Sequence, residues 1–249
     1  MAKQIKYGLI GKNISYSFSK SFFSKKFDTL KLENCSYENF DLSSIDELPL
    51  ILNENIGILK GLNVTIPYKQ KIFKYLDEVD KAAEQIGAVN TIKISNDLKL
   101  KGFNTDVYGF ENSLKPMLKE YMKHALILGT GGASKAVAFV LNNLNIDFKF
   151  VSRSTKNEET ISYRSIDQNI LEKYTLVINC TPLGTFPDIE KSPDLPYHML
   201  THKHLLFDLI YNPVLSSFLK KGSEYGTITK NGQEMLELQA DRSWEIWNS

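Results

Sequence analysis

A glycine-rich loop between a strand-like and a helix-like segment is the first feature of the sequence that could carry chemistry. An apolar run over residues 125–128 leads into Gly129-Thr130-Gly131-Gly132-Ala133-Ser134, and a helical pattern continues to Leu144. Glycines let a pyrophosphate approach the backbone N–H groups and the positive dipole at a helix start. Ser134 replaces the third glycine of G-x-G-x-x-G and is still small enough for close helix packing. The loop favours a dinucleotide site, and a tight structural turn is the alternative.

The residues after the next expected strand bear on which dinucleotide would bind. An NAD-specific site carries an acidic residue about 20 positions on, bonded to the ribose 2′-hydroxyl. Here that place holds Ser152-Arg153-Ser154-Thr155-Lys156, with no carboxylate. An arginine among hydroxyls suits a 2′-phosphate, and one charged hydrogen bond, about 1.5–3 kcal/mol, corresponds to roughly ten- to hundredfold preference. The segment favours NADP over NAD, with a solvent-exposed loop arginine as the alternative.

Two pairs of small polar residues could converge on a hydroxylated ligand. Ser17 and Ser19 are two positions apart, as are Asn63 and Thr65, so in an extended chain each pair faces one side. Taken alone, either pair is also compatible with ordinary loop chemistry. Lys69 taken alone is compatible with a surface lysine near a helix start, and Asp106 with a plain helix cap.

The order of these segments along the chain resembles that of the shikimate dehydrogenase family, and the match spans nearly the whole sequence. The N-terminal matches are Ser15-Tyr16-Ser17-Phe18-Ser19-Lys20, Asn63-Val64-Thr65-Ile66-Pro67-Tyr68-Lys69, Gly87-Ala88-Val89-Asn90-Thr91 and Asn104-Thr105-Asp106. The later matches are the loop 129–134, Asn179-Cys180-Thr181-Pro182-Leu183-Gly184, Asp208-Leu209-Ile210-Tyr211-Asn212-Pro213 and Asn231-Gly232-Gln233-Glu234-Met235-Leu236. Correct order over this length is hard to obtain by chance.

The resemblance implies a reversible, NADPH-dependent reduction of 3-dehydroshikimate to shikimate, a step of chorismate and aromatic amino acid biosynthesis. It implies that Lys69 donates the proton and that Asp106 orients Lys69, since negative charge develops on the ketone oxygen as hydride arrives. The substrate carboxylate is expected at Ser17, Ser19 and Tyr211. The ring and its hydroxyls are expected among Asn63, Thr65, Lys69, Asn90, Asp106 and Gln239. Hydroxyl and amide groups suit this task because such a site penalises analogues that lack a hydroxyl.

The resemblance also implies a set of cofactor-binding residues. They are Gly129, Gly131, Gly132, Ala133, Ser134, Ser152, Arg153, Ser154, Lys156, Thr181, Leu209 and Gly232. The sequence departs from the family pattern at Lys20, where a proline is common, and at Ser152, which is usually asparagine. The chain also ends soon after Trp247, so a final helix of the family is expected to be missing while Gln239 is retained.

The hydrophobic pattern predicts different secondary structure in the two halves of the chain, and these elements would position the residues named above. The N-terminal half combines strand, helix and hairpin patterns, whereas from His124 short apolar strands alternate with helices, which indicates βαβ units and a parallel sheet. In the first half we expect strands over 7–11 and 61–66, helices over 21–30, 67–76 and 81–86 (closed by Gly87), and a hairpin of 91–94 with 98–100. In the second we expect strands over 125–128, 148–151, 176–180 and 205–209, and helices over 132–144 and 232–247.

We therefore expect a two-domain α/β protein. With the resemblance, residues 1–105, completed by the C-terminal helix 232–249, form an α/β substrate domain. Residues 106–231 form a Rossmann-like NADP-binding domain. The active site is expected in a cleft between the two.

Charge and composition exclude several other functions. The 30 basic and 29 acidic residues leave a formal net charge of +1, and no arginine-rich stretch is present, so the footprint of a general nucleic-acid binder is missing. The N-terminus lacks the apolar core of a signal peptide, and the sequence has no apolar run long enough to span a membrane. We expect a cytoplasmic protein, monomer or homodimer, that binds a small molecule.

Cysteine and histidine positions also limit the chemistry. Cys35 and Cys180 do not form a disulfide framework of the secreted kind, so we expect reduced thiols. The four histidines show no convincing partner cluster, so we expect no metal site. They are His124, His198, His202 and His204.

Two other functions remain as alternatives. A quinate/shikimate dehydrogenase would accept an additional ring hydroxyl and use NAD or both cofactors, against which Arg153 without an acidic neighbour argues. A catalytically silent binding protein would keep the fold as a sensor or scaffold, against which the retained Lys69 and Asp106 argue.

Overall fold

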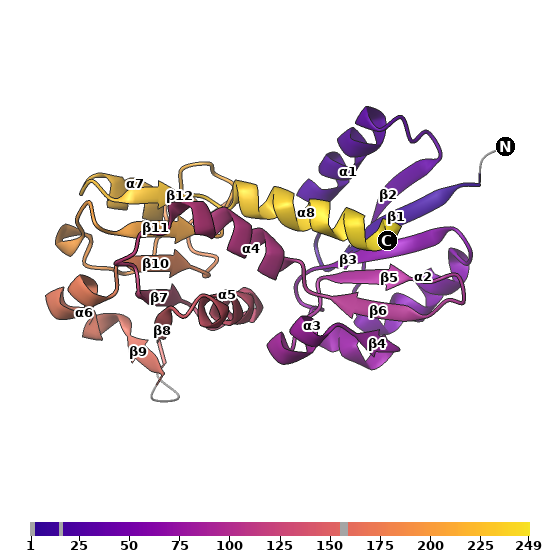
Figure 1. Cartoon of the computed structure of the whole chain (residues 1–249). Coiled ribbons are helices and arrows are strands. Elements are labelled where there is room, and N and C mark those ends of the chain that lie inside the picture. Colours follow the sequence, from indigo (N-terminus) through magenta and orange to yellow (C-terminus); the bar gives the residue numbers. More distant parts are fainter. Residues whose placement is uncertain (1–2, 15–16, 155–158) are drawn as a thin grey trace. The chain divides into compact units, whose positions relative to one another are not determined.

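The chain folds into two compact α/β units, shown in Figure 1. The structure is a computed structural model that describes residues 3–14, 17–154 and 159–249. Unit 1 contains the chain up to Thr105 together with Gln239–Ser249, and unit 2 is Asp106–Leu238. The chain enters unit 2 at the start of helix α4 (Asp106–Leu114) and returns to unit 1 within helix α8 (Gln233–Asn248). The α/β fold class is confirmed.

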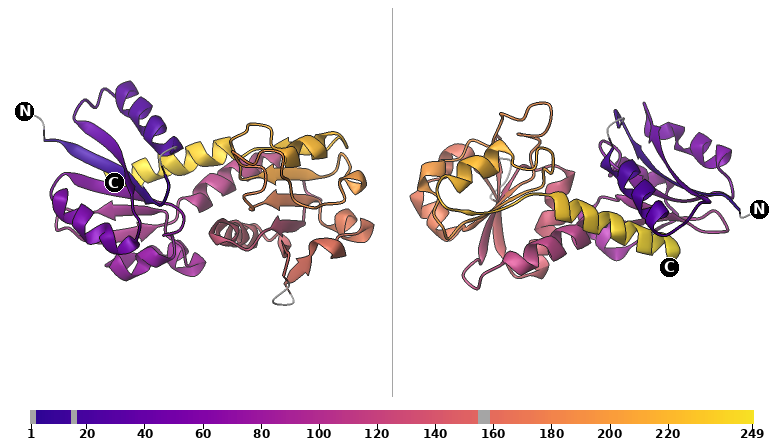
Figure 2. Two further views of the ribbon diagram at one scale, coloured as in Figure 1. Left: turned by 180° about the vertical axis from the view of Figure 1, so that it is seen from behind. Right: turned by 90° about the horizontal axis from the view of Figure 1, so that it is seen from above.

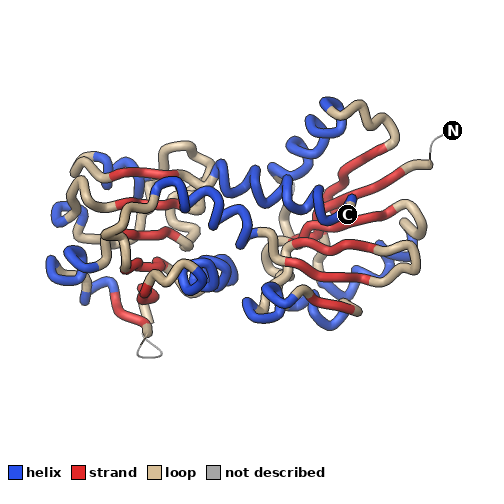
Figure 3. The backbone as a smooth tube through the Cα atoms, viewed as in Figure 1, coloured by secondary structure: helices blue, strands red, loops and turns tan. Residues whose placement is uncertain are grey.

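Unit 1 is built on a six-stranded mixed sheet in the order β2-β1-β3-β5-β6-β4. Strand β1 runs parallel to β2 and β3, β5 is antiparallel to β3 and β6, and β4 is parallel to β6. The strands are β1 (Ile5–Gly11), β2 (Cys35–Asp41), β3 (Leu59–Val64), β4 (Glu78–Val79), β5 (Thr91–Ile94) and β6 (Leu100–Phe103). The expected hairpin is thus confirmed as β5 and β6 (red in Figure 3).

Alternating residues of this sheet feed two apolar clusters, one on each face. On one face Ile10, Leu62 and Ile92 pack with residues of α2 (Leu48–Glu54) and α3 (Lys81–Ile86). On the other face the aromatic residues of α1 (Phe18–Thr29) and of the end of α8 cover Tyr7 and Tyr37. The remaining helical elements are the 3-10 turns η1 (Ile45–Glu47) and η2 (Lys71–Tyr75).

In unit 1, the predicted helix that local residues determine is confirmed, and the one whose conformation depends on tertiary hydrogen bonds is wrong. Helix α3 covers the expected residues, and Gly87 closes it with a left-handed φ of 68°, which glycine adopts without strain. The helix expected over 67–76 is wrong: turns occupy 66–70, and only η2 is helical. The Lys69 carbonyl accepts from the Val89 N–H at 2.8 Å, and the Tyr68 hydroxyl donates to the Leu42 carbonyl at 2.6 Å. These tertiary bonds hold the segment out of a regular helix.

Unit 2 is a six-stranded sheet, all parallel, in the order β12-β11-β10-β7-β8-β9. The strands are β7 (His124–Leu128), β8 (Asp147–Ser152), β9 (Thr160–Ser162), β10 (Leu176–Asn179), β11 (Leu205–Asp208) and β12 (Ile228–Lys230). The order runs outward in both directions from β7, so the topological switch point lies between β7 and β10. In a sheet of this kind ligands bind beyond the carboxyl ends of the strands at that point.

Helices cover both faces of the unit 2 sheet, as Figures 1 and 2 show. Helices α4, α5 (Gly132–Asn143) and the first turns of α8 pack on Ile127 and Ile178. Helices α6 (Gln168–Lys173) and α7 (Ser217–Ser223) pack on Leu126 and Val177. The short 3-10 turns are η3 (Lys115–Met117), η4 (Tyr163–Ser165) and η5 (Tyr197–Met199). This doubly wound arrangement confirms the predicted parallel sheet.

Candidate functional site

The glycines between β7 and α5 differ in what requires them. Gly129 has a left-handed φ of 99°, so the turn itself needs glycine. A Cβ added to Gly131 or Gly132 would meet nothing within 4 Å, and Gly131, the N-cap of α5, has an ordinary φ of −80°. Neither close packing nor backbone strain therefore accounts for these two glycines. The open space lies over the N–H groups of a helix start, which fits a bound pyrophosphate.

Ser134 and Gly232, two other expected cofactor residues, hold the surrounding backbone together. The Ser134 side chain is buried, and its hydroxyl donates to the Gly131 carbonyl at 2.6 Å, which fixes the first turn of α5. The Gly232 N–H donates to the Ile210 carbonyl at 3.0 Å. An added Cβ on Gly232 would lie 2.2 Å from the Leu209 carbonyl oxygen, so this glycine is required by close backbone packing.

The loops with the remaining expected cofactor residues leave one edge of the unit 2 sheet. Leu128 of β7 pairs with Val151 of β8 and with Asn179 of β10, and Asn179 pairs with Asp208 of β11. The four strands therefore end side by side. Ser152 is the last residue of β8, and the loops that follow the four strands carry Gly129, Arg153, Ser154, Thr181 and Leu209.

A buried polar network that we did not predict from the sequence fixes the loops after β10 and β11. Asn179 Oδ1 accepts from the Thr181 N–H at 3.0 Å and from its hydroxyl at 2.7 Å, while Asn179 Nδ2 donates to Asp208 at 2.9 Å. Asp208 also accepts from the Ile210 N–H and the Ser216 hydroxyl. Burial raises the pKa of Asp208 to about 6 in spite of these donors. The sequence signal for this network was the polar residue that ends each of two buried strands, Asn179 in β10 and Asp208 in β11.

A cavity of about 420 Å³ opens beside the glycine loop within unit 2. Its polar lining includes the hydroxyls of Ser152 and Ser154 and the ammonium-bearing side chain of Lys135 in the first turns of α5. The Arg153 side chain is exposed near Tyr163, where its charge opposes the rise in the pKa of Tyr163 caused by burial. Lys156 lies outside the described residues. Lysine and hydroxyl groups together fit a 2′-phosphate, and sequence reasoning missed Lys135.

In unit 1, the arrangement expected for Ser17 and Ser19 is wrong. Ser17 is the N-cap of α1 and its side chain accepts from the Ser19 N–H at 3.2 Å, while Ser19 lies inside the helix. Their side chains therefore do not share one side of an extended chain. Serine is a strong helix N-cap, because its oxygen satisfies an N–H that has no partner within the helix. Both side chains remain half-buried at the start of α1.

Asn63 and Thr65 behave as expected from strand alternation. Asn63 lies in β3 with 6% of its surface exposed, and the Thr65 N–H extends the strand pairing by donating to the Ile10 carbonyl at 2.9 Å. The Thr65 side chain lies against Gly11, where an added Cβ would come within 2.5 Å of the Thr65 methyl group. The two side chains thus leave the sheet on the same side.

Asn63 is the centre of a buried hydrogen-bond network. Its Oδ1 accepts from the Tyr37 hydroxyl at 2.8 Å, and its Nδ2 lies 3.2 Å from Thr91 Oγ1 and 3.0 Å from Ser243 Oγ. Burial raises the pKa of Tyr37, so the hydroxyl stays protonated, and a hydrogen bond with Ser19 acts in the opposite direction. Tyr37, Thr91 and Ser243 come from distant parts of the chain, and sequence reasoning missed all three.

A second part of the network joins Asn90, Thr105 and α8. Asn90 Oδ1 accepts from the Thr105 N–H at 2.7 Å and from its hydroxyl at 3.2 Å. Thr105 Oγ1 also lies 3.4 Å from Gln239 Oε1 and 3.2 Å from Ser243 Oγ. The structure therefore brings three expected substrate residues of unit 1, Asn63, Asn90 and Gln239, into one polar cluster.

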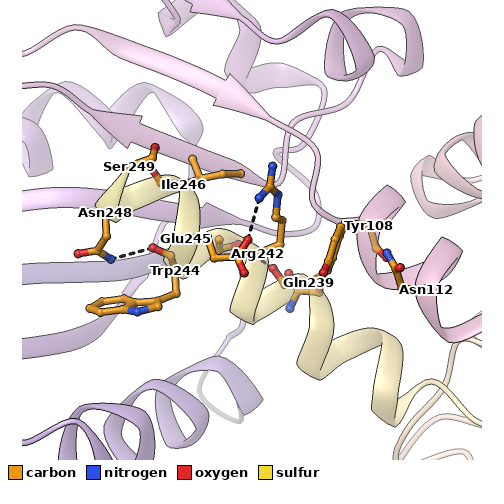
Figure 4. A network of polar contacts seen from close by, with 10 residues as sticks. Tyr108, Asn112, Gln239, Arg242, Trp244, Glu245, Ile246, Asn248 and Ser249 are labelled. Carbon is orange, nitrogen blue, oxygen red and sulfur yellow. Dashed lines mark hydrogen bonds and ion pairs between the residues drawn. The ribbon is translucent and has the colours of Figure 1, made fainter.

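The end of α8 shows why Gln239 and Ser243 are available to this cluster. Arg242 and Glu245 are both exposed and form an ion pair at 2.7 Å, and Asn248 Nδ2 donates to the Trp244 carbonyl at 2.7 Å. Dashed lines mark both contacts in Figure 4. Ser243 is fully buried, and its hydroxyl donates to the Gln239 carbonyl one turn earlier at 3.0 Å. The polar surface of the helix is thus separate from the face that joins the network.

The remaining expected site residues lie at element ends. Lys69 is half-buried in the turn before η2. Asp106 is the first residue of α4 and is 8% exposed. Tyr211 is half-buried in the loop after β11, and burial raises the pKa of its hydroxyl.

Two absences hold for the part of the chain that the structure describes. Within 3–14, 17–154 and 159–249, no cluster of three or more His, Cys, Asp or Glu side chains could hold a metal ion. None of the described helices combines the length and apolar character needed to cross a bilayer.

A glycine loop at the switch point of a doubly wound parallel sheet defines the nucleotide-binding α/β class, here joined to a second unit with a buried hydroxyl and amide cluster. Residues 9–92 match the model of the shikimate dehydrogenase substrate binding domain. The chain is 40% identical to a shikimate dehydrogenase (NADP(+)) of Methanococcus maripaludis, over 96% of this chain and 90% of that protein.

Solved structures agree with this match. A shikimate dehydrogenase in complex with NADP+ is 33% identical, has a TM-score of 0.86, and is matched over 99% of this chain and 91% of that one. The Thermus thermophilus shikimate 5-dehydrogenase in complex with NADP(H) and shikimate is 30% identical with a TM-score of 0.85, over 98% and 93%. The chain belongs to the shikimate dehydrogenase family.

Proposed function

We propose that the protein is an NADP-dependent shikimate dehydrogenase that reversibly reduces the ring ketone of 3-dehydroshikimate, a step of aromatic amino acid biosynthesis. The observation that supports this most is the similarity to NADP-named shikimate dehydrogenases over 96% of this chain and 90% of the Methanococcus maripaludis protein. The buried cluster of Asn63, Asn90 and Gln239 adds independent support, since hydroxyl and amide groups suit a polyhydroxylated ring.

We assign substrate binding to residues 1–105, completed by the C-terminal helix 232–249, and NADP binding to residues 106–231. Ser17, Ser19 and Tyr211 would bind the substrate carboxylate. Asn63, Thr65, Asn90 and Gln239 would bind the ring hydroxyls. An N-cap serine suits the carboxylate because the start of a helix attracts negative charge.

Lys69 and Asp106 are proposed as the catalytic pair. When bound at unit 2, NADPH would supply the hydride for this reduction. The Lys69 ammonium then donates a proton to the ketone oxygen, on which negative charge develops, and in the reverse direction the neutral amine takes the proton back. Asp106 would orient the ammonium toward the ketone oxygen.

Backbone bonds within unit 1 support this pairing. The Lys69 carbonyl is bonded to the Val89 N–H, and the neighbouring Asn90 side chain is bonded to Thr105, the residue before Asp106. Two short hydrogen bonds therefore link the backbone of the lysine segment to the segment that ends at Asp106.

The NADP-binding residues are proposed from the edge of the unit 2 sheet. Gly131, Gly132 and Ala133 would receive the pyrophosphate at the start of α5, with Gly129 and Ser134 shaping the loop. Ser152, Arg153, Ser154 and Lys156 would bind the 2′-phosphate. Thr181, Leu209 and Gly232 would complete the set of cofactor-binding residues.

The broader setting is also a proposal. A cytoplasmic protein, monomer or homodimer, with two reduced thiols fits the sequence, and burial raises the pKa of both Cys35 and Cys180, which keeps them as unreactive thiols.

An absorbance assay of NAD(P)H formation tests the function. Shikimate and quinate are each offered with NADP+ and with NAD+, in four combinations. We expect the highest kcat/KM for shikimate with NADP+. A preference for quinate with NAD+ would favour the quinate/shikimate dehydrogenase alternative, and no turnover in any combination would favour a silent binding protein.

A further inference from the structure

Tyr37 is a fully buried tyrosine whose hydroxyl is bonded to the proposed substrate site. It lies in β2 with 4% of its surface exposed, and its ring stacks on Phe23 with centroids 4.6 Å apart and an interplanar angle of 11°. The hydroxyl donates to Asn63 Oδ1 at 2.8 Å. The phenol of Tyr37 is thus bonded to a residue that is expected to contact the substrate ring.

The bonds around Asn63 leave its amide with one orientation. Its carbonyl oxygen receives the Tyr37 O–H, and its two N–H groups face Thr91 Oγ1 and Ser243 Oγ. A flipped amide would place its oxygen against the Asn90 carbonyl, which only accepts and lies 3.4 Å from Nδ2, and against the Ser243 hydroxyl, whose proton already goes to the Gln239 carbonyl. The remaining lone pair on Asn63 Oδ1 is therefore held in a fixed direction as an acceptor.

We propose that Tyr37 is a positioning residue for the substrate, which orients Asn63 as a hydrogen-bond acceptor for a ring hydroxyl. The inference rests on the proposed shikimate dehydrogenase function. Tyr37 itself does not touch the reacting atoms, so its loss should weaken substrate binding and leave the chemical step and NADP+ binding in place.

Tyr7 provides a matched control for Tyr37. The two tyrosines pair directly across β1 and β2, are 3% and 4% exposed, and belong to the same apolar cluster. The Tyr7 ring stacks on Trp247 at 4.8 Å, and a hydrogen bond with Asn248 at the end of α8 opposes the rise in the pKa of Tyr7 caused by burial. The side-chain partners of Asn63 given above are Tyr37, Thr91 and Ser243. Tyr→Phe at either position therefore removes one hydroxyl from the same core.

The experiment compares steady-state kinetics of the wild type, Tyr37→Phe and Tyr7→Phe. We expect Tyr37→Phe to raise the KM for shikimate about two- to tenfold, the range for one hydrogen bond between uncharged groups, with kcat and the Kd for NADP+ within about twofold of wild type. Tyr7→Phe should keep the wild-type KM. Thermal unfolding of both variants shows whether their stability losses are similar.

Different results overturn different claims. If Tyr37→Phe and Tyr7→Phe share the wild-type KM for shikimate, the positioning role is wrong while the enzyme assignment stands. A wild-type protein that does not oxidise shikimate overturns the proposed function and this role with it.

Ser243→Ala is a second variant that keeps the test decisive if Tyr37→Phe does not fold. It removes the acceptor 3.0 Å from Asn63 Nδ2 and should raise the KM for shikimate by a similar factor. Ser113→Ala is its control, because the Ser113 hydroxyl is similarly buried but donates to the Phe110 carbonyl within α4 of unit 2. An unchanged KM in Ser243→Ala contradicts the network's role in substrate binding.

Discussion

Gly132→Ala should separate the stability of the nucleotide loop from its function. Gly132 is the first residue of α5, and an added Cβ would meet no atom within 4 Å. Alanine is the better helix former by up to about 1 kcal/mol and restricts the unfolded chain. The substitution should therefore leave the free energy of unfolding unchanged or raise it by less than about 1 kcal/mol.

The same methyl group should obstruct the cofactor. The open space lies over the N–H groups at the start of α5, where the pyrophosphate is expected. Displacing one charge-assisted hydrogen bond costs about 1.5–3 kcal/mol, which corresponds to roughly 10- to 150-fold weaker binding. Titration of NADPH fluorescence gives the Kd, and urea unfolding of the same sample gives the stability.

Gly87→Ala is the opposite control. Gly87 also has open space around it, but its φ of 68° strains any residue with a side chain. This variant should lose stability by roughly 1 kcal/mol and keep the wild-type Kd for NADP+. A Gly132→Ala protein with unchanged NADP+ affinity would refute the reasoning that the loop is open in order to receive a pyrophosphate.

Three further outcomes follow from single side chains. Lys135→Gln should weaken NADP+ binding by about tenfold without changing NAD+ binding. Lys173 is exposed, and Lys173→Gln should change the affinity for neither cofactor. Equal losses of NADP+ and NAD+ affinity in Lys135→Gln would exclude Lys135 from binding the 2′-phosphate. The pKa of Asp208 is 3.8 in the unfolded chain and about 6 in the folded protein. The protonated carboxyl therefore stabilises the fold fully below pH 3.8, and this contribution of about 3 kcal/mol is lost as the pH rises through 6. Asp208→Asn should gain stability relative to wild type over that range, and a difference independent of pH would contradict the shift. Gly61→Ala places a Cβ 2.2 Å from Trp247 Nε1 and should lower the free energy of unfolding by about 1–3 kcal/mol, which an unchanged urea midpoint would disprove.

Local pattern was sufficient for much of unit 2 and for part of unit 1. The apolar runs before Gly129 and Cys180 form buried parallel strands, and the turn signal around Asn96 joins β5 to β6. Helix α3 ends at Gly87 as expected. In each case the periodicity or the turn chemistry within a few residues decides the structure.

The features that sequence reasoning did not predict depend on contacts between residues that are far apart in the chain. Ser17 was expected in extended chain but caps α1, since an N-cap and a strand serine look alike in sequence. Strand β2 was missed because its half-polar sequence gains its order from pairing with β1. Tyr37 and Ser243 meet at Asn63 although they come from near opposite ends of the sequence. No local pattern indicates such a meeting.

The turnover number of Lys69→Ala, measured beside the wild type with shikimate and NADP+, tests the proposed enzyme and its mechanism most directly. We predict that the wild type oxidises shikimate and that the variant loses about 10²- to 10⁴-fold in kcat, as expected for a missing general acid, while its Kd for NADP+ stays close to wild type. A Lys69→Ala protein that turns over at nearly the wild-type rate would contradict the assignment of the proton-transfer step to this lysine.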